Sequence, residues 1–209
     1  MKYVSLISSG IDSAVATYLM SKKTDEMILI HANNQPFIEE IEIDKFLEIV
    51  KHLNKILDCK IKTIIVENGP SLLEYRKNCD KKFTCVFCKR MMLRYAEKIA
   101  EKQKAIAIVM GDSLGQVASQ TLQNIKTIEQ AVNTAVIRPL IGFDKQEIIE
   151  IAKKIGTYEI SILHSIDCTA VPYMPSTQAK LDKIVQEESK IDISRLVNQA
   201  IKRQKIIKI

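Results

Sequence analysis

The sequence lacks tryptophan, has only 5% aromatic residues among 209, and contains no apolar run of the ~18 residues that a membrane-spanning helix requires. Aromatic surfaces for stacking nucleic-acid bases are therefore scarce. The N-terminus lacks the basic-then-apolar layout of a signal peptide, because Met1-Lys2 leads directly into a short apolar run. No repeat or low-complexity linker is present. We expect a cytosolic protein without membrane attachment.

Length and composition favour one domain, or a domain with a small appendage. The sequence is 46% hydrophobic and 27% charged, which allows both a core and a soluble surface. Its net charge of +6 is compatible with a polyanionic partner. The stretch from Arg195 to Lys208 is basic and contains no acid. The alternative for this stretch is a solvated helix face.

Short runs rich in valine and isoleucine alternate with longer helical patterns, which predicts an α/β fold. We expect a doubly wound, mainly parallel five-stranded sheet with helices on both faces, and ligands beyond the carboxyl ends of its strands. The predicted strands are Lys2–Ile7, Met27–His31, Ile61–Val66, Ala105–Gly111 and Val136–Arg138. The predicted helices are Ser13–Lys22, Ile38–Leu57, Cys85–Lys102, Gly115–Gln130, Lys145–Ile155, Gln178–Glu188 and Ile193–Lys205.

The first strand is followed by the turn Ser8-Ser9-Gly10-Ile11-Asp12-Ser13, after which a helix begins at Asp12 or Ser13. Such a turn directs unpaired N–H groups and the helix dipole at one point, where small side chains let a phosphate approach. Asp12 can also hold a magnesium ion. The alternative is an ordinary strand-to-helix turn with Asp12 as the N-cap.

A second loop of the same physical type, Gly111 to Gln116, follows the strand that ends near Met110. Adjacent parallel strands would bring both loops to one cleft, although a plain connecting turn is the alternative. Lys89 and Arg90 can neutralise phosphate charge, or they are two exposed helical bases. His31 ends a strand and can contact a nucleotide, or it is a structural histidine.

The five cysteines are expected to be thiols, metal ligands or redox groups in a reducing cytosol. Cys85 and Cys88 form a Cys-x-x-Cys motif at a helix start, which favours thiolates. Redox chemistry and metal binding both fit this pair. With Cys79 and Cys168 it could form a zinc site, and three cysteines could hold an iron–sulfur cluster. Alternatively, Cys79 and Cys168 are unrelated loop cysteines, and Cys59 is plain core or surface.

These motifs together resemble the PP-loop ATP pyrophosphatases, and within them the catalytic domain of the tRNA 4-thiouridine sulfurtransferases. The opening turn is similar to the family's Ser-Gly-Gly-x-Asp-Ser loop, and residues 85–92 to its Cys-Val-x-Cys-Lys-Arg-Met-Met segment. Residues 111–121 resemble its Gly-Glu-Ser-Leu-Gly-Gln-Val-Ala-Ser-Gln-Thr segment. Residues 138–142, 155–161 and 167–168 also match, in family order and spacing.

The resemblance implies that ATP adenylates the C4 oxygen of a uridine, uridine 8 of tRNA in the family, and that sulfur then displaces AMP to give 4-thiouridine. We expect a PP-loop domain over residues 1–175, a C-terminal helical extension over 176–209, ATP with Mg²⁺, and catalytic roles for Asp12 and Cys168. The implied nucleotide contacts are Leu6, Ile7, Ser8, Ser9, Gly10, Asp12, Ser13, His31, Ala32, Lys89, Gly111 and Gln120.

The Cys-x-x-Cys is found in archaeal-type members of this family, and by that resemblance a 4Fe-4S cluster falls on Cys85, Cys88 and Cys168. An open iron could bind sulfide and pass it to the adenylated base. In some bacterial members a rhodanese domain delivers persulfide sulfur to the cysteine that matches Cys168. This sequence has no such domain, and the expected donor is sulfide or persulfide.

Three departures from the family pattern stand out. Ser9 replaces the first loop glycine, Asp112 replaces a glutamate, and the turn begins almost at Met1, without the THUMP region that grips tRNA in full-length members. We expect a separate THUMP-type protein or the basic C-terminal helix to bind tRNA, and a homodimer is compatible with the sequence. The alternatives are sulfur transfer to another nucleoside or small molecule, and a nucleotide-binding module with structural zinc.

Overall fold

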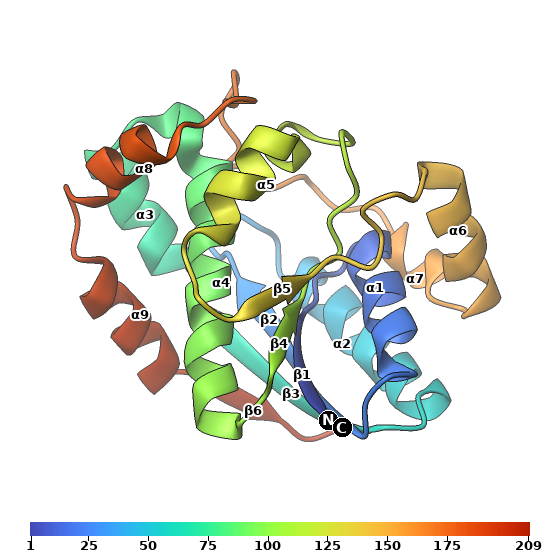
Figure 1. Ribbon diagram of the computed structural model, residues 1–209. Coiled ribbons are helices and arrows are strands. Elements are labelled where there is room, and N and C mark those ends of the chain that lie inside the picture. The colour runs from blue at the N-terminus through green and yellow to red at the C-terminus, as the bar shows by residue number, and fades with distance from the viewer.

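The computed structural model describes residues 1–209, and its centre is a six-stranded sheet with the strand order β5-β4-β1-β2-β3-β6 (Figure 1). The first five strands are parallel, and β6 pairs antiparallel with β3. The mainly parallel α/β fold predicted from the sequence is therefore confirmed. The strands are β1 (Lys2–Leu6), β2 (Glu26–Asn33), β3 (Lys60–Glu67), β4 (Ala107–Val109), β5 (Ala135–Ile137) and β6 (Lys205–Ile207).

The predicted count of five strands was wrong because the C-terminal residues form β6. The last helix ends at Lys202, and the chain then turns back along β3, where Thr63 pairs with Ile207. The apolar stripe of that helix ends at Ile201, while the outer edge of β3 offers unpaired backbone groups. Residues 176–209 therefore comprise two helices and one strand of the main sheet.

Helices cover both faces of the sheet (Figure 1). They are α1 (Ile11–Ser21), α2 (Ile41–Ile56), α3 (Gly69–Asn78), α4 (Thr84–Gln103), α5 (Leu122–Glu129), α6 (Lys145–Lys154), α7 (Tyr158–Ser161), α8 (Leu181–Glu188) and α9 (Ile193–Lys202). None of them is both long and apolar enough to cross a membrane.

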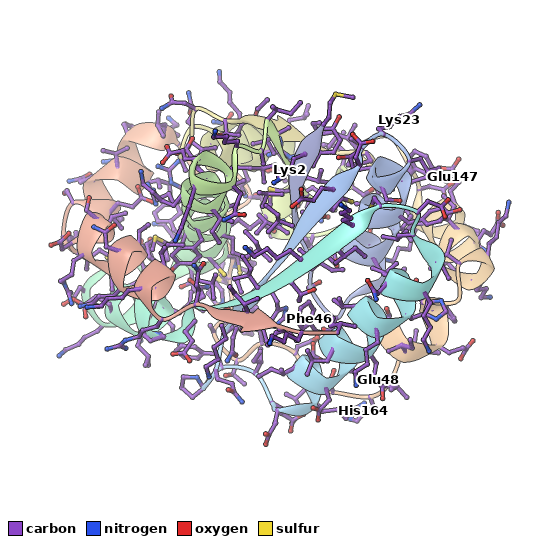
Figure 2. The ribbon with its side chains drawn as sticks, turned by 90° about the horizontal axis from the view of Figure 1, so that it is seen from below. Lys2, Lys23, Phe46, Glu48, Glu147 and His164 are labelled. Atoms are coloured by element: carbon purple, nitrogen blue, oxygen red, sulfur yellow. The ribbon has the colours of Figure 1, made fainter.

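The strand side chains alternate between two cores. Val4 and Leu6 of β1 belong to a core of 26 residues shared with α3, α4, α5, α8 and α9. Tyr3 belongs to a second core of 19 residues, shared with α1, α2 and α6. In Figure 2, Phe46 lies between α2 and the sheet, whereas Lys23 and Glu147 lie at the edge of the molecule. Because successive side chains of β1 point to opposite faces of the sheet, this strand contributes to both cores.

One predicted helix begins later in the structure, and two helices of the structure were not predicted. The helix expected over 115–130 begins only at Leu122, after a short 3₁₀ turn (Ala118–Gln120), because Gly115 has a φ of 78° and Thr121 caps the helix through Asn124 N. The sequence patterns did not indicate α3 or α7. α3 begins with Gly69-Pro70, a start that the missing proline N–H permits, and α7 is a single turn.

A buried ion cluster ties α4 to α8. Glu188 accepts from Arg90 Nε at 2.8 Å and from Arg94 Nη2 at 2.7 Å, and its side chain is only 7% exposed. Burial by itself would raise the pKa of Glu188, but the two arginines outweigh it and hold the pKa below its ordinary value of 4.5. Arg90 is therefore a structural residue, and its predicted role in neutralising phosphate was wrong.

Replacing Glu188 with alanine leaves Arg90 buried without its carboxylate. We expect Glu188→Ala to lower the free energy of unfolding by about 3–5 kcal/mol, measured by urea denaturation at pH 7. Because the folded pKa is lowered, the ionised cluster stabilises the fold above pH 4.5, and the difference from wild type shrinks as the pH falls below that value. Glu101→Ala, which breaks only an exposed pair with Lys98, serves as the control. Equal stability of both variants would contradict the prediction.

Candidate functional site

A cavity of about 840 Å³ opens where β1, β2 and β4 end, at the point where the strand order reverses. All twelve residues predicted to contact a nucleotide line this cavity, and so does Cys168. The structure thus brings together residues from the first turn, from β2, from α4 and from the loop after β4. Their roles stay predictions, but their common location agrees with a single binding site.

The turn after β1 is stabilised by hydrogen bonds from its backbone N–H groups to its own serine hydroxyls. Ser13 Oγ accepts from Ser8 N at 3.0 Å, and Ser8 Oγ accepts from Gly10 N at 3.2 Å. α1 begins at Ile11, and its N-cap residue Gly10 has no side chain to occupy the free N–H groups. Asp12 lies in the first helical turn, so it is not the N-cap. The helix N-terminus therefore points into the cavity without an internal cap.

The loop after β4 lies directly against this turn. A Cβ atom on Gly111 would come within 2.7 Å of Ser13 Cα and 2.8 Å of Ser13 N. No other residue type fits here without moving the backbone of α1. The close contact fixes the spacing between the two loops that the sequence pattern had placed in one cleft.

The lysines of the cavity wall are paired with carboxylates. Lys89 Nζ lies 2.6 Å from Asp112 Oδ1, and Lys145 Nζ lies 2.6 Å from Asp12 Oδ1. Asp112 also accepts from Arg138 Nε at 3.2 Å. Burial favours a raised pKa for Asp112, but Lys89 and Arg138 reverse this effect and lower it. These carboxylates are hard oxygen ligands of the kind that Mg²⁺ prefers.

His31 is a neutral acceptor on the cavity wall. Burial lowers its pKa to about 4, so the ring is uncharged at neutral pH. Its Nδ1 lies 3.1 Å from the Ile7 carbonyl oxygen and therefore carries the proton, while Nε2 has no partner. The ring stacks on Phe46 with 4.3 Å between centroids. A ligand N–H or O–H can satisfy Nε2.

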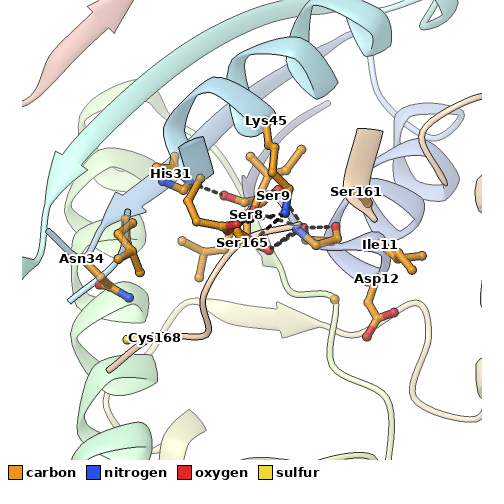
Figure 3. A pocket seen from close by; sticks show the side chains of 18 of the residues that line it. Ser8, Ser9, Ile11, Asp12, His31, Asn34, Lys45, Ser161, Ser165 and Cys168 are labelled. Atoms are coloured by element: carbon orange, nitrogen blue, oxygen red, sulfur yellow. Dashed lines mark hydrogen bonds and ion pairs between the residues drawn. The ribbon is translucent and has the colours of Figure 1, made fainter. Parts of the chain in front are cut away.

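Two functional candidates on α2 were missed by the sequence interpretation. Glu42 accepts a hydrogen bond from Ser9 Oγ and another from Lys45 Nζ at 2.9 Å. Lys45 also donates to Leu163 O at 2.9 Å and to Ser165 Oγ at 3.0 Å (Figure 3). We call Ser9, Glu42 and Lys45 the brace. One signal was available: Lys45 is a charged residue within the apolar stripe of α2.

Cys85, Cys88 and Cys168 form a group beside the cavity. Cys85 and Cys88 lie in the first turns of α4, and Cys168 lies in the loop after α7. Burial raises the pKa of Cys88 to about 12, and the neighbouring charges of Cys168 and Cys85 add to this effect. Burial and Cys168 also raise the pKa of Cys85. Cys85 and Cys88 thus both lie within electrostatic range of Cys168.

The other two cysteines belong elsewhere. Cys79 Sγ donates to the Glu187 carbonyl oxygen at 3.2 Å, and Cys59 packs against the smaller core. No three His, Cys, Asp or Glu side chains are grouped as ligands of a single metal ion, so the four-cysteine zinc arrangement is not found. In a 4Fe-4S cluster each cysteine binds a different iron, so its sulfur atoms need not converge on one point.

Carboxamide N–H groups surround the sulfur of Cys88. Asn68 Nδ2 lies 3.3 Å from Cys88 Sγ, and Asn34 Nδ2 lies 4.0 Å from it. Tyr95 Oη donates to Asn68 Oδ1 at 3.0 Å, which directs the amide nitrogen toward the sulfur. Hydrogen bonds to sulfur are among the factors that tune iron–sulfur clusters. Three thiols with N–H donors nearby thus fit the donor set of such a cluster.

The parallel sheet, the small-residue turn after β1 and the loop packed against it define an α/β protein of the PP-loop type. A family model described as Thiamine biosynthesis protein (ThiI) matches residues 1–193, and the chain belongs to this family. The resemblance seen in the sequence motifs is therefore confirmed.

The chain is similar to curated tRNA sulfurtransferases. It is 41% identical over 209 residues to the probable tRNA sulfurtransferase of Methanosarcina mazei, covering 100% of this chain and 52% of that protein. It is 45% identical over 184 residues to the one of Methanobrevibacter smithii, covering 88% of this chain and 48% of that protein. The chain thus spans about half the length of the curated relatives it matches.

Two solved structures share the fold. The crystal structure of a 4-thiouridine synthetase–RNA complex with bound ATP matches with a TM-score of 0.93 and 37% identity, over 99% of this chain and 54% of that one. NMN synthetase from Francisella tularensis matches with a TM-score of 0.59 and 15% identity, over 97% of this chain and 84% of that one. The second likeness concerns the fold alone.

A methyl group at position 111 has no room beside the first turn of α1. We expect Gly111→Ala to lower the free energy of unfolding by about 1–3 kcal/mol, because the loop and the turn must separate. Gly142→Ala is the matched control, since its added Cβ meets nothing within 4 Å. Denaturation curves of the two variants make the comparison. Similar stabilities would show that the contact at Gly111 does not constrain the site.

Proposed function

We propose that this chain is the catalytic half of an ATP-dependent tRNA 4-thiouridine synthetase. One observation carries the proposal: Cys168 lines the same cavity as the turn from Ser8 to Ser13. A turn suited to phosphate and a sulfur-bearing residue therefore face the same cavity. The family, the relatives named tRNA sulfurtransferases and the ATP-bound 4-thiouridine synthetase support the same reaction.

In this proposal the turn and Lys89 hold the phosphates of ATP. The N-terminus of α1 supplies unpaired N–H groups, and Lys89 supplies a positive charge. Leu6, Ile7, His31 and Ala32 face the nucleoside, and the free Nε2 of His31 accepts from it. Asp12 holds Mg²⁺, which neutralises charge on the phosphates. Gly111 and Gln120 complete the site from the second loop.

The reaction then has two steps. The C4 oxygen of the uridine attacks the α-phosphorus of ATP, the bond to the β-phosphate breaks, and pyrophosphate leaves. Sulfide next adds to C4, and the adenylated oxygen leaves as AMP, so that one oxygen is replaced by one sulfur. Adenylation is needed because it converts a poor leaving oxygen into a good one. No electron transfer is required when sulfide is the donor.

Cys85, Cys88 and Cys168 would hold a 4Fe-4S cluster. Bound by three cysteines, such a cluster leaves one iron able to take a sulfide ion. Burial raises the pKa of Cys85 and Cys88 and opposes the thiolates expected from the helix N-terminus, so binding of a metal would have to displace their protons. Cys168 brings the group to the cavity wall. A persulfide on Cys168 is the other form in which sulfur could arrive.

The tRNA substrate requires a surface beyond the cavity. The net charge of +6 and the basic residues of the C-terminus suit a polyanion. A separate THUMP-type protein would supply further RNA contacts, and a homodimer would present two such surfaces. The cytosolic location stays a prediction. The bounds of the PP-loop domain, residues 1–175, also stay a prediction.

Loss of Cys168 separates the two steps. We expect Cys168→Ala to abolish formation of 4-thiouridine while pyrophosphate release from ATP in the presence of tRNA continues, because the phosphate site is unchanged. Anaerobically purified protein is assayed by mass spectrometry of tRNA nucleosides and by pyrophosphate release. Cys59→Ala, in the smaller core, is the cysteine control.

Two results would count against the assignment. Thiolation that survives Cys168→Ala excludes that residue from sulfur transfer. Iron and sulfide analysis of the wild type gives the second test, because stoichiometric zinc without iron would refute the cluster.

A further inference from the structure

The brace joins the phosphate turn to the segment that carries Cys168. On one side Ser9 Oγ donates to Glu42, and on the other Lys45 Nζ donates to the carbonyl oxygen of Leu163 and the hydroxyl of Ser165. Lys45 itself is only 5% exposed. We call residues 161–168 the Cys168 segment. Figure 3 shows Ser9, Lys45 and Ser165 grouped above Cys168.

The brace depends on the one unusual residue of the turn. Ser9 stands where the sequence pattern of the family has glycine, and a glycine has no hydroxyl to donate. The link from the turn to Glu42 is therefore made by a side chain that the usual loop lacks. Ser9 is buried at 6% exposure, so its hydroxyl has few other partners.

Every donor of the brace is already in use. A serine hydroxyl has one proton, and that of Ser9 goes to Glu42. A lysine ammonium has three, and those of Lys45 go to Glu42, Leu163 and Ser165. All three members of the brace line the cavity. A phosphate oxygen in the turn can gain a hydrogen bond from Ser9 or Lys45 only by displacing a present acceptor.

The charge of each acceptor determines which of them Lys45 binds when a phosphate is present. A polyphosphate carries more negative charge than the single carboxylate of Glu42, and the two anions repel each other across the cavity. Lys45 is attracted to the phosphates more strongly than to the neutral oxygens of Leu163 and Ser165. The bonds that yield first are therefore the two from Lys45 to the Cys168 segment.

We propose that the brace is a switch: a phosphate group in the turn draws Ser9 and Lys45 from their present partners and thereby loosens the Cys168 segment. ATP as the natural ligand rests on the proposed function. Contacts at both ends of the segment stay in place: Ser161 N donates to Thr157 O at 3.1 Å, and Ile166 N donates to Glu39 Oε2 at 3.1 Å. Just after the segment, Thr169 N donates to Phe37 O at 2.9 Å. The segment thus shifts about fixed points, which opens the cavity beside Cys168 to a second substrate once nucleotide is bound.

Hydrogen exchange of the full chain tests the switch. We expect saturating Mg–ATP, or pyrophosphate alone, to raise exchange in residues 161–168 of the wild type about tenfold. In Lys45→Met, residues 161–168 should exchange rapidly without ligand, and added ligand should not raise their exchange further. Ser9→Gly keeps the Lys45 contacts, so it should remain slow without ligand and respond about threefold or less. Lys51→Met, on the exposed side of α2, should behave like the wild type.

The outcomes separate the switch from the proposed function. If calorimetry shows bound nucleotide while exchange in residues 161–168 is unchanged, the switch is wrong and the proposed function stands. If neither ATP nor pyrophosphate binds, the proposed function is wrong and the switch falls with it. If Lys45→Met fails to fold, the response of Ser9→Gly decides, and a full wild-type response in that variant overturns the role of Ser9.

Discussion

The contact between Gly111 and the first turn of α1 is the constraint on which the site depends. β1 lies between β2 and β4 and is parallel to both, so the loops that follow these three strands begin at the same end of the sheet. Only a residue without a side chain lets the loop after β4 touch the backbone of Ser13. That contact fixes the spacing between the turn after β1 and the loop after β4, and both segments line one cavity together with Lys89.

Electrostatic pairing gives this cavity an unusual resting state. Lys45, Lys89 and Lys145 each contact a carboxylate at 2.9 Å or less. The positive charges of these lysines are thus already paired with carboxylates of the protein. An anion that enters alone meets the carboxylates as well, whereas one that arrives with a divalent cation can divide the pairs between phosphate and metal.

Local patterns predicted the two loops, the Cys-x-x-Cys helix and the parallel core, because each depends on residues close in sequence. Contacts between distant segments were not visible in the same way. Arg90 looked like a phosphate ligand until the fold paired it with Glu188, nearly a hundred positions away. β6 was missed because three residues carry too little pattern to identify a strand, and its pairing is decided by the free edge of β3. The Lys45 contacts depend on a loop more than a hundred residues downstream.

β6 has a further effect on the molecule as a whole. β3 is eight residues long and contains the apolar run Ile64-Ile65-Val66, with an outer edge that would otherwise present free backbone groups. Such an edge is a template on which identical chains add to one another. β6 occupies part of it, from Thr63 to Ile65, and places Lys205 there. The edge of the sheet on this side is therefore the three-residue β6, and so short an edge with a lysine on it opposes edge-to-edge addition of identical chains. This property concerns the colloidal behaviour of the protein rather than its chemistry.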